Sequence, residues 1–245
     1  MSDVKLPKSL KAVPFPGTSQ EDRFSTTQDL IAETSYRIVD PDSNSTWGYV
    51  AIDNTQRGPG LGGIRMVQDL SLNEISRLAR VMTMKNSSAC LPYGGAKAGL
   101  TLKSFELTDN FAIREELIEK LADCLFELSA YVPAPDMGTN ENDIQIIYNN
   151  HTRKLSTDKH SRGGAGRPVE KGGIPIDDWE LTAHGLFSAI QALESRDETL
   201  DLSKAKFIVQ GFGNVGAPTA LKLQESGATL VGASDINIAL WNPNG

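Results

Sequence analysis

The clearest chemical pattern in the sequence is a glycine motif near its C-terminal end. The run FIVQGFGNVG contains the spacing Gly211-x-Gly213-x-x-Gly216, with an apolar strand before it and a helix and a second strand after it. Gly211 permits a tight turn, Gly213 lets the backbone approach a pyrophosphate, and Gly216 allows close packing of helix on strand. The start of the helix also presents N–H groups to a phosphate. The order of these parts predicts a binding site for the dinucleotide NAD or NADP.

Asp235 lies nineteen residues after Gly216, at the end of the second predicted strand. A carboxylate at this place hydrogen-bonds the adenosine ribose hydroxyls and repels a 2′-phosphate, which favours NAD over NADP. Only ten residues follow Asp235. We therefore expect no third strand in this sheet, and we expect the chain to be a fragment of a longer protein.

Three clusters of polar residues beside glycine or proline lie upstream of the motif: GPGLGGIRM (58–66), MTMKNSSACLPYGGAKAGL (82–100) and PAPDMGT (133–139). Lys97 has glycines on both sides, so its amine could project into a cleft where partial desolvation lowers its pKa toward neutral pH. An isolated GGAK segment is more typical of a surface lysine on a glycine turn. By the same default, Lys85 is a solvated helix residue, and Asp136 is a turn former or a helix cap.

Together the clusters resemble the glutamate/leucine/phenylalanine/valine dehydrogenase family over about residues 30 to 245. LPYGGAKAGL is similar to the family's active-site lysine segment, and Lys85 lies twelve residues before Lys97, as in the family. PAPDMGT resembles the loop of the catalytic aspartate, GRPVEKGG the domain-linking segment, and GFGNVG with SDINIALWNPNG the coenzyme domain. The resemblance implies an α/β fold in which an N-terminal substrate-binding and oligomerisation domain precedes a Rossmann domain.

The resemblance also implies an activity, the reversible oxidation of an L-amino acid to a 2-oxo acid and ammonia with hydride transfer to NAD or NADP. In that reaction Lys85 pairs with the substrate α-carboxylate, and Lys97 polarises the carbonyl group or activates the attacking water. Asp136 transfers a proton to and from the amino group, a role that suits a carboxylate with a raised pKa.

Further residues of the coenzyme site follow from the same resemblance. Thr182 in ELTAHG and Asn214 in the glycine loop, where Val215 also lies, match positions near the nicotinamide end of the coenzyme. Without the resemblance, Thr182 is a helix residue bonded to its own backbone, and Asn214 caps the next helix. His184 is interpreted as a packing or surface residue, since nothing near it in the sequence completes a metal site.

The first cluster departs from the pattern of the glutamate-specific members. Those members carry a lysine before the pair Gly62 and Gly63, where it binds the side-chain carboxylate of the substrate, and Leu61 stands there in this chain. A leucine cannot neutralise a second carboxylate, and burying one without a partner is costly, which favours an apolar substrate such as leucine or valine. The linker and SDINIALWNPNG, in contrast, resemble the glutamate-type members. The substrate stays open between glutamate and a branched-chain amino acid.

Predicted strands and helices must position these residues. We expect strands in WGYVAID after Thr46, in IRM at 64–66 and in KFIVQ at 206–210, and loops at RGPGLGG and LPYGGAKAGL. Apolar residues at helical spacing predict helices from Asp69 or Ser71 to Asn86, from Asp109 to Ala130, up to about Asn150, and from about Asp178 to Glu194. We divide the chain into a flexible arm at 1–25, a substrate-binding and oligomerisation domain at 26–177, and an incomplete Rossmann domain at 178–245.

Composition limits the partners. The formal charge of -7 and a pI near 5.1 argue against nucleic acid. No stretch approaches the roughly 18 apolar residues of a membrane span. Cys90 and Cys124 belong to no CxxC pair or metal-ligand cluster, so we expect reduced thiols, no metal and a cytoplasmic protein. The expected ligands are an amino acid, its 2-oxo acid and ammonia, and the resemblance implies a homo-oligomer.

Two other classes of function stay open. A Rossmann reductase acting on another small acid would normally carry its glycine motif near the N-terminus or use a tyrosine or histidine acid, whereas here a long domain precedes the motif. The second class is a non-catalytic or regulatory subunit of the same fold. The presence of Lys85, Lys97 and Asp136 argues against that class, whereas the expected truncation of the coenzyme domain argues for it.

Overall fold

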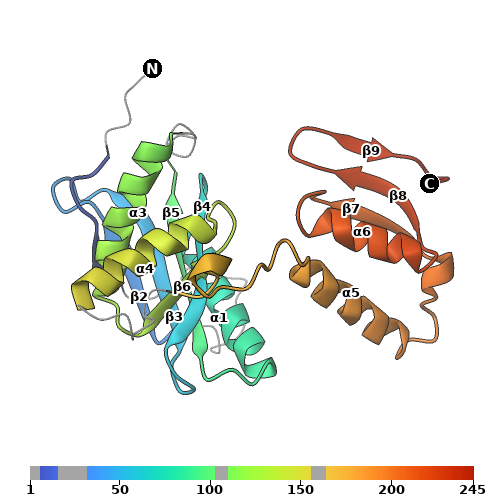
Figure 1. Cartoon of the computed structure of the whole chain (residues 1–245), viewed down its shortest axis with the longest axis horizontal. Helices are drawn as coiled ribbons and strands as arrows, with labels where there is room; N and C mark the ends of the chain where they lie inside the picture. The colour runs from blue at the N-terminus through green and yellow to red at the C-terminus, as the bar shows by residue number, and fades with distance from the viewer. Residues whose placement is uncertain (1–5, 16–31, 103–109, 156–163) are drawn as a thin grey trace. The chain divides into compact units, whose positions relative to one another are not determined.

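The computed structural model describes residues 6–15, 32–102, 110–155 and 164–245. The chain divides into two compact units, Met1–Ile174 and Pro175–Gly245, and each has its own β-sheet (Figure 1). Among the described residues, no helix has both the length and the apolar character that crossing a bilayer requires.

The first unit is built on a mixed sheet with the strand order β1-β2-β3-β5-β4-β6. β4 runs parallel to β5 and β6, and the other neighbours are antiparallel. The strands are β1 (Lys11–Pro14), β2 (Thr34–Val39), β3 (Thr46–Asn54), β4 (Gly60–Val67), β5 (Gly94–Thr101) and β6 (Tyr131–Pro135). The helices are α1 (Leu72–Ser88), α3 (Phe111–Phe126) and α4 (Glu141–Leu155), followed by a 3₁₀ turn at Val169–Lys171.

Helices cover both faces of this sheet, α1 on one face and α3 with α4 on the other (Figure 1). The main core lies under α3 and α4, where Ala98 and Leu100 of β5 cluster with Leu117 and Leu121 of α3. A smaller apolar cluster that includes Ile75 holds α1 against the opposite face. The central strands are therefore buried on both faces, which removes the simple alternation of polar and apolar residues from their sequences.

The alternation of side chains along β5 decides where its lysine points. Ala98 faces the main core, whereas Gly95 and Gly99 face α1. A Cβ on Gly95 would lie 2.2 Å from Oγ1 of Thr83 in α1, so only glycine lets the helix come this close. Lys97 lies between the two glycines and therefore shares the α1 face of the sheet.

Two segments that were expected to be loops are strands. LPYGGAKAGL supplies most of β5, and RGPGLGG enters β4 at Gly60. Glycine allows β4 and β5 to lie close together here, because a Cβ on Gly62 would lie 1.6 Å from the carbonyl oxygen of Ala96. The expected strands in WGYVAID, IRM and KFIVQ are confirmed. The expected helices are confirmed with different ends, since α3 stops at Phe126 instead of Ala130 and α4 continues to Leu155, while Asp109 lies outside the described residues. Ser71 caps α1 by accepting the N–H of Glu74 at 3.1 Å.

Part of the expected N-terminal arm is a strand. β1 pairs with β2, and Nζ of Lys120 in α3 donates to the carbonyl oxygen of Pro7 at 2.6 Å. Segments 1–5 and 16–25 of that arm lie outside the described residues.

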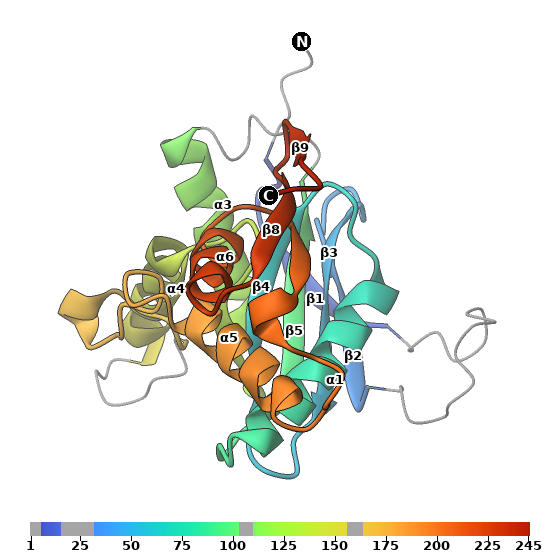
Figure 2. The same cartoon turned by 90° about the vertical axis from the view of Figure 1, so that its right-hand side faces the viewer.

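The second unit has a sheet of strand order β7-β8-β9, with β7 and β8 parallel and β8 and β9 antiparallel. Its elements are α5 (Leu181–Glu194), a 3₁₀ turn at Leu202–Lys204, β7 (Lys206–Gln210), α6 (Gly216–Glu225), β8 (Thr229–Ser234) and β9 (Ala239–Trp241). Both views show α5 and α6 on the same side of the sheet (Figure 2). Leu202, Leu223 and Phe207 form the core between them and the sheet.

The expectation that no third strand follows Asp235 is wrong. Asp235 opens a tight turn: its backbone N–H donates to the carbonyl oxygen of Ile238, and its carboxylate accepts the N–H groups of Asn237 and Ile238 at 2.7 and 2.8 Å. The turn is short enough for the few remaining residues to return antiparallel to β8 as β9.

Candidate active site

Lys97 is a buried lysine on a central strand. Its side chain is 6% exposed, and its Nζ lies 3.1 Å from Oδ2 of Asp136. Burial lowers the pKa of the Lys97 ammonium, the neighbouring charges of Arg65 and Lys85 lower it further, and the Asp136 carboxylate raises it only in part. Lys97 therefore lies neither on a turn nor at the surface, and it loses its proton more readily than a solvated lysine does.

Asp136 follows directly after β6 and is held between two cations. Its Oδ2 accepts from Nε of Arg65 at 2.9 Å and from Lys97. Burial by itself raises the pKa of this carboxyl, but the charge of Lys97 and the hydrogen bonds from Arg65 and Lys97 outweigh that effect. The net pKa of Asp136 lies below its usual range. The expectation of a raised pKa is therefore wrong for the site in this state, in which Asp136 is an ionised carboxylate.

Arg65 is a site residue that the sequence pattern did not single out. It lies on β4, and its Nη1 is 2.5 Å from Oε1 of Glu74 in α1 while its Nε contacts Asp136. Burial lowers the pKa of the guanidinium, but Asp136 and Glu74 together hold it above its usual value. Its place in the cluster GPGLGGIRM can identify it, because Arg65 comes two residues after Gly63 and therefore lies on the same face of the strand.

Gly63 makes the contact between the lysine and the aspartate possible. A Cβ on Gly63 would lie 2.7 Å from Cβ of Asp136 and 3.3 Å from Nζ of Lys97. Gly62 is needed for the packing of β4 on β5, as its contact with Ala96 shows. Leu61 is half-buried and shares a strand face with Gly63. The glycine pair thus shapes the site by leaving room for other groups.

Lys85 lies in the last turn of α1 with its side chain exposed. Its charge is close enough to lower the pKa of Lys97. The buried amide of Asn86 fixes this end of the helix by donating to the carbonyl oxygens of Gly94 at 2.6 Å and Leu61 at 3.3 Å. An exposed ammonium in this place can bind the carboxylate of a small ligand.

The glycine loop of the second unit joins β7 to α6. Gly211 has a φ of 90°, and a Cβ on Gly211 or Gly213 would meet nothing within 4 Å. A Cβ on Gly216 would lie 2.0 Å from the carbonyl oxygen of Gly211, so close packing requires this glycine. Asn214 and Val215 are exposed, and no side chain caps the N-terminus of α6. Open space beside glycine backbone at an uncapped helix N-terminus fits a bound pyrophosphate.

The other predicted coenzyme residues are exposed positions of the second unit. Thr182 lies in the first turn of α5, and Asp235 lies directly after β8, where backbone N–H groups lower the pKa of its carboxyl. His184 is exposed on α5. Within the described ranges, no group of His, Cys, Asp and Glu side chains could hold a metal ion.

Protein-family models match most of the first unit and all of the second. Residues 30–153 match the model described as "Glu/Leu/Phe/Val dehydrogenase, dimerisation domain". Residues 172–245 match the model described as "Glutamate/Leucine/Phenylalanine/Valine dehydrogenase". These ranges contain the lysines and the aspartate in the first case and the glycine loop in the second.

Individual relatives agree with these matches. A protein of Saccharolobus shibatae described as "NADP-specific glutamate dehydrogenase" is 32% identical over 202 residues, which are 81% of this chain and 46% of the relative. The hetero-hexameric glutamate dehydrogenase of Thermus thermophilus, solved in a Leu-bound form, is 26% identical with a TM-score of 0.69, covering 98% of this chain and 52% of that one. Glutamate dehydrogenase of Peptoniphilus asaccharolyticus, at 23% identity and a TM-score of 0.65, covers 98% of this chain and 56% of that one and supports the fold. The chain thus spans about half the length of these relatives.

Proposed function

Because the chain belongs to the Glu/Leu/Phe/Val dehydrogenase family, we propose that it carries the substrate residues and the coenzyme loop of an NAD(P)-dependent amino acid dehydrogenase. The reaction is the reversible oxidative deamination of an L-amino acid to a 2-oxo acid and ammonia. The observation that carries this proposal is the buried pair of Lys97 with Asp136 at 3.1 Å. A base and an acid whose pKa values are shifted by burial and by each other are suited to proton transfer.

Each side chain has a role that its surroundings support. The exposed Lys85 pairs with the substrate α-carboxylate. In its ammonium form, Lys97 polarises the carbonyl group. In its amine form, Lys97 activates water, and its lowered pKa favours this form. Asp136 is ionised before the substrate binds, so it can accept a proton from the substrate amino group in the deamination direction. NAD(P), when bound, supplies the hydride acceptor for the α-carbon.

The two oxygens of Asp136 have different surroundings. Arg65 and Lys97 both contact Oδ2, while no hydrogen bond to Oδ1 occurs among the described residues. We assign Oδ1 as the oxygen that takes the proton, because protonation at Oδ2 would break two charge-assisted bonds. Arg65 then keeps the carboxylate ionised and oriented, and Glu74 holds Arg65 in place.

We propose NAD as the preferred coenzyme. The carboxylate of Asp235 is exposed directly after β8, where it would bind ribose hydroxyls and repel a 2′-phosphate. The Saccharolobus relative is described as NADP-specific, so a preference for NAD would distinguish this chain from it. The residues proposed to bind the coenzyme are Thr182, Gly211, Gly213, Asn214, Val215, Gly216 and Asp235.

We propose that the substrate has an apolar side chain. Leu61 lies two residues from Gly63 on the face of β4 that carries the site, where glutamate-specific members of the family carry a lysine. Leucine or valine needs no counter-charge at Leu61, whereas the second carboxylate of glutamate would be buried without a partner.

We also propose a cytoplasmic homo-oligomer. The model that matches residues 30–153 is described as a dimerisation domain, and the Thermus relative is hetero-hexameric. Cys90 and Cys124 are free thiols, as a reducing compartment favours, and burial raises the pKa of Cys124 to about 12.

The proposal is tested by NAD(P)H formation at alkaline pH. The full-length gene product is supplied in turn with glutamate, leucine, valine, phenylalanine and alanine, each with NAD and with NADP. We expect turnover on the branched-chain substrates with NAD. Turnover on glutamate alone would contradict the role of Leu61 and point to another cation. Failure of every combination would favour a non-catalytic subunit of the same fold.

A further inference from the structure

The loop that carries Asp136, residues 136–140, is tied to α3 by an ion pair that does not touch the reacting groups. We propose that Arg114 and Asp143 are positioning residues for Asp136: their pair anchors this loop and so sets how closely the Asp136 carboxylate meets Lys97. The inference rests on the proposed role of Asp136 in proton transfer, and its structural half can be measured without turnover.

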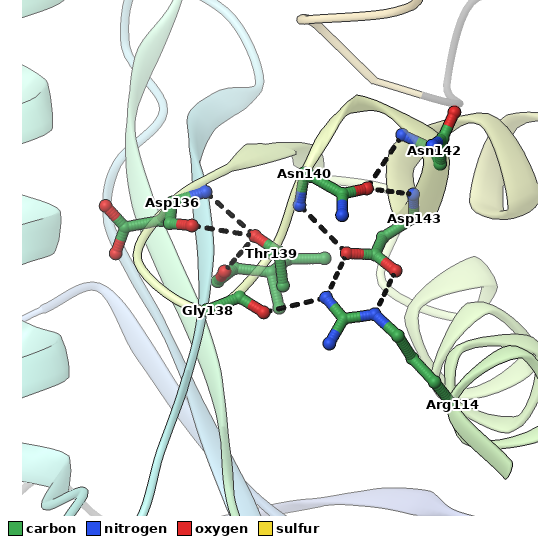
Figure 3. A network of polar contacts seen from close by, with 8 residues as sticks. Arg114, Asp136, Gly138, Thr139, Asn140, Asn142 and Asp143 are labelled. Atoms are coloured by element: carbon green, nitrogen blue, oxygen red, sulfur yellow. Dashed lines mark hydrogen bonds and ion pairs between the residues drawn. The ribbon is translucent and has the colours of Figure 1, made fainter. Parts of the chain in front are cut away.

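The side chain of Arg114 donates three hydrogen bonds among the described residues, which join α3 to the loop and to α4 (Figure 3). Its Nε donates to Oδ1 of Asp143 at 2.8 Å and its Nη2 donates to Oδ2 at 2.6 Å. The same Nη2 donates to the carbonyl oxygen of Gly138 at 2.8 Å. The two side chains are 14% and 3% exposed, so the pair is largely shielded from solvent. One guanidinium therefore fixes the middle of the loop and the first turn of the next helix together.

Asp143 also holds the end of the loop. Its Oδ2 accepts the backbone N–H of Asn140 at 2.8 Å, and Oδ1 of Asn140 accepts the N–H groups of Asn142 at 2.9 Å and Asp143 at 3.2 Å. This reciprocal arrangement is a capping box, which defines where α4 starts. The loop thus ends at a helix start whose position depends on the same carboxylate that binds Arg114.

The beginning of the loop is fixed to β4. The Thr139 hydroxyl accepts the N–H of Asp136 at 2.8 Å and donates to the carbonyl oxygen of Ile64 at 2.7 Å. Gly138 has a φ of 82°, and a Cβ on it would lie 2.0 Å from the carbonyl oxygen of Met66. The loop therefore has little room against the strand, and a change at Gly138 is transmitted along two peptide bonds to Asp136.

Loss of the Arg114 anchor has a predictable electrostatic result. Asp136 raises the pKa of Lys97, and Lys97 and Arg65 lower the pKa of Asp136. A displaced loop lengthens both contacts to Oδ2, so the pKa of Lys97 should fall and that of Asp136 should rise. A purely structural ion pair far from the site would leave both values unchanged.

The test compares Arg114→Met with the unaltered protein. Competitive acetylation with acetic anhydride, read residue by residue by mass spectrometry, reports the amine fraction of Lys97. We expect Lys97 in Arg114→Met to react about 3- to 10-fold faster at neutral pH, because a lower pKa increases the fraction of reactive amine. Hydrogen exchange at the backbone N–H groups of residues 136–140 should also be faster. In turnover assays, kcat should fall about 10- to 100-fold while KM for the amino acid changes little.

Three further variants separate positioning from stability. Arg153→Met removes another link between α4 and α3, the pair with Glu119 at 3.0 Å, which does not contact the loop. Leu121→Ala weakens the core under α3 and supplies a protein of comparably reduced stability. Arg114→Lys keeps the charge but loses the bidentate fork. Compared with Arg114→Met, it should therefore regain more of the stability of the unaltered protein than of the original Lys97 reactivity. If Arg114→Met does not fold, Arg114→Lys and Asp143→Asn serve in its place.

The proposal is overturned if the Arg114 variants match Arg153→Met and Leu121→Ala in both the reactivity of Lys97 and the exchange of the loop. It is supported if only the Arg114 and Asp143 variants change them. Absence of turnover in the unaltered protein would refute the proposed function instead, and it would leave the acetylation and exchange results interpretable.

Discussion

The protonation of two neighbouring side chains is the residue-level feature on which the proposed reaction depends. Burial lowers the pKa of Lys97, while the charge of Lys97 and the hydrogen bonds from Arg65 and Lys97 keep the pKa of Asp136 below its usual range despite burial. Because the two groups lie 3.1 Å apart, a change in one alters the pKa of the other.

Asp136→Asn should lower the pKa of Lys97 further below 10.5, because it removes the carboxylate that raises that pKa. The pH dependence of Lys97 acetylation measures the change. Lys8, whose side chain is 84% exposed and pairs with Asp42, is the internal reference in the same digest. An unchanged or raised pKa of Lys97 would show that Asp136 does not stabilise its ammonium.

Leu61→Lys should shift the substrate preference toward glutamate. The new ammonium supplies the counter-charge for a second carboxylate, and the loss of the leucine side chain removes apolar surface from the site. We therefore expect the ratio of kcat/KM for glutamate over leucine to rise about 10- to 100-fold. Leu61→Met keeps the apolar character and should leave the ratio close to its original value. Equal ratios in both variants would mean that Leu61 does not contact the substrate side chain.

At the level of elements, glycine has two different uses in this chain, packing at Gly62 and ligand access at Gly213. A Cβ at Gly62 would overlap the Ala96 carbonyl, whereas a Cβ at Gly213 meets nothing within 4 Å. Gly62→Ala should therefore lower the free energy of unfolding by about 2 kcal/mol or more. Gly213→Ala should leave it unchanged and weaken coenzyme binding instead.

Urea unfolding and coenzyme titration of both variants check this pair of expectations. If Gly213→Ala destabilised the fold as much as Gly62→Ala does, the open space beside the loop would not be a ligand site. If Gly62→Ala were neutral, β4 and β5 would have to separate more easily than their contact indicates.

The helices were predictable from sequence, and the central strands were harder. The apolar spacing of Leu72 and Ile75 marks α1, and the cap Ser71 marks its start. β5 cannot be recognised from sequence, because its glycines indicate a turn unless the helix packed against them is known. The ion pairs of Arg65 could not be predicted, since Glu74 and Asp136 meet it only after three elements assemble. Lys97 illustrates both cases, because the desolvation that lowers its pKa can be expected from the sequence, whereas its place on a central strand and its contact with Asp136 cannot.

At the scale of the whole molecule, each unit has its own sheet and core. Residues 1–174 contain the first sheet, the helices α1, α3 and α4 and the Lys97–Asp136 site. We expect a fragment of residues 1–174 to unfold cooperatively and to retain the lowered pKa of Lys97. Circular dichroism and the acetylation assay test this. An unstructured fragment, or one in which Lys97 reacts like a solvated lysine, would show that the first unit depends on the second.

Amino-acid-dependent formation of NAD(P)H tests whether proton transfer passes through Asp136. It is measured for the unaltered full-length gene product, for Asp136→Asn, and for Asp42→Asn as the control at an exposed aspartate. We expect turnover by the unaltered protein and by Asp42→Asn, and kcat/KM about 10²- to 10⁴-fold lower in Asp136→Asn with coenzyme affinity unchanged. Equal turnover in all three proteins would contradict the account, because proton transfer would then not pass through Asp136.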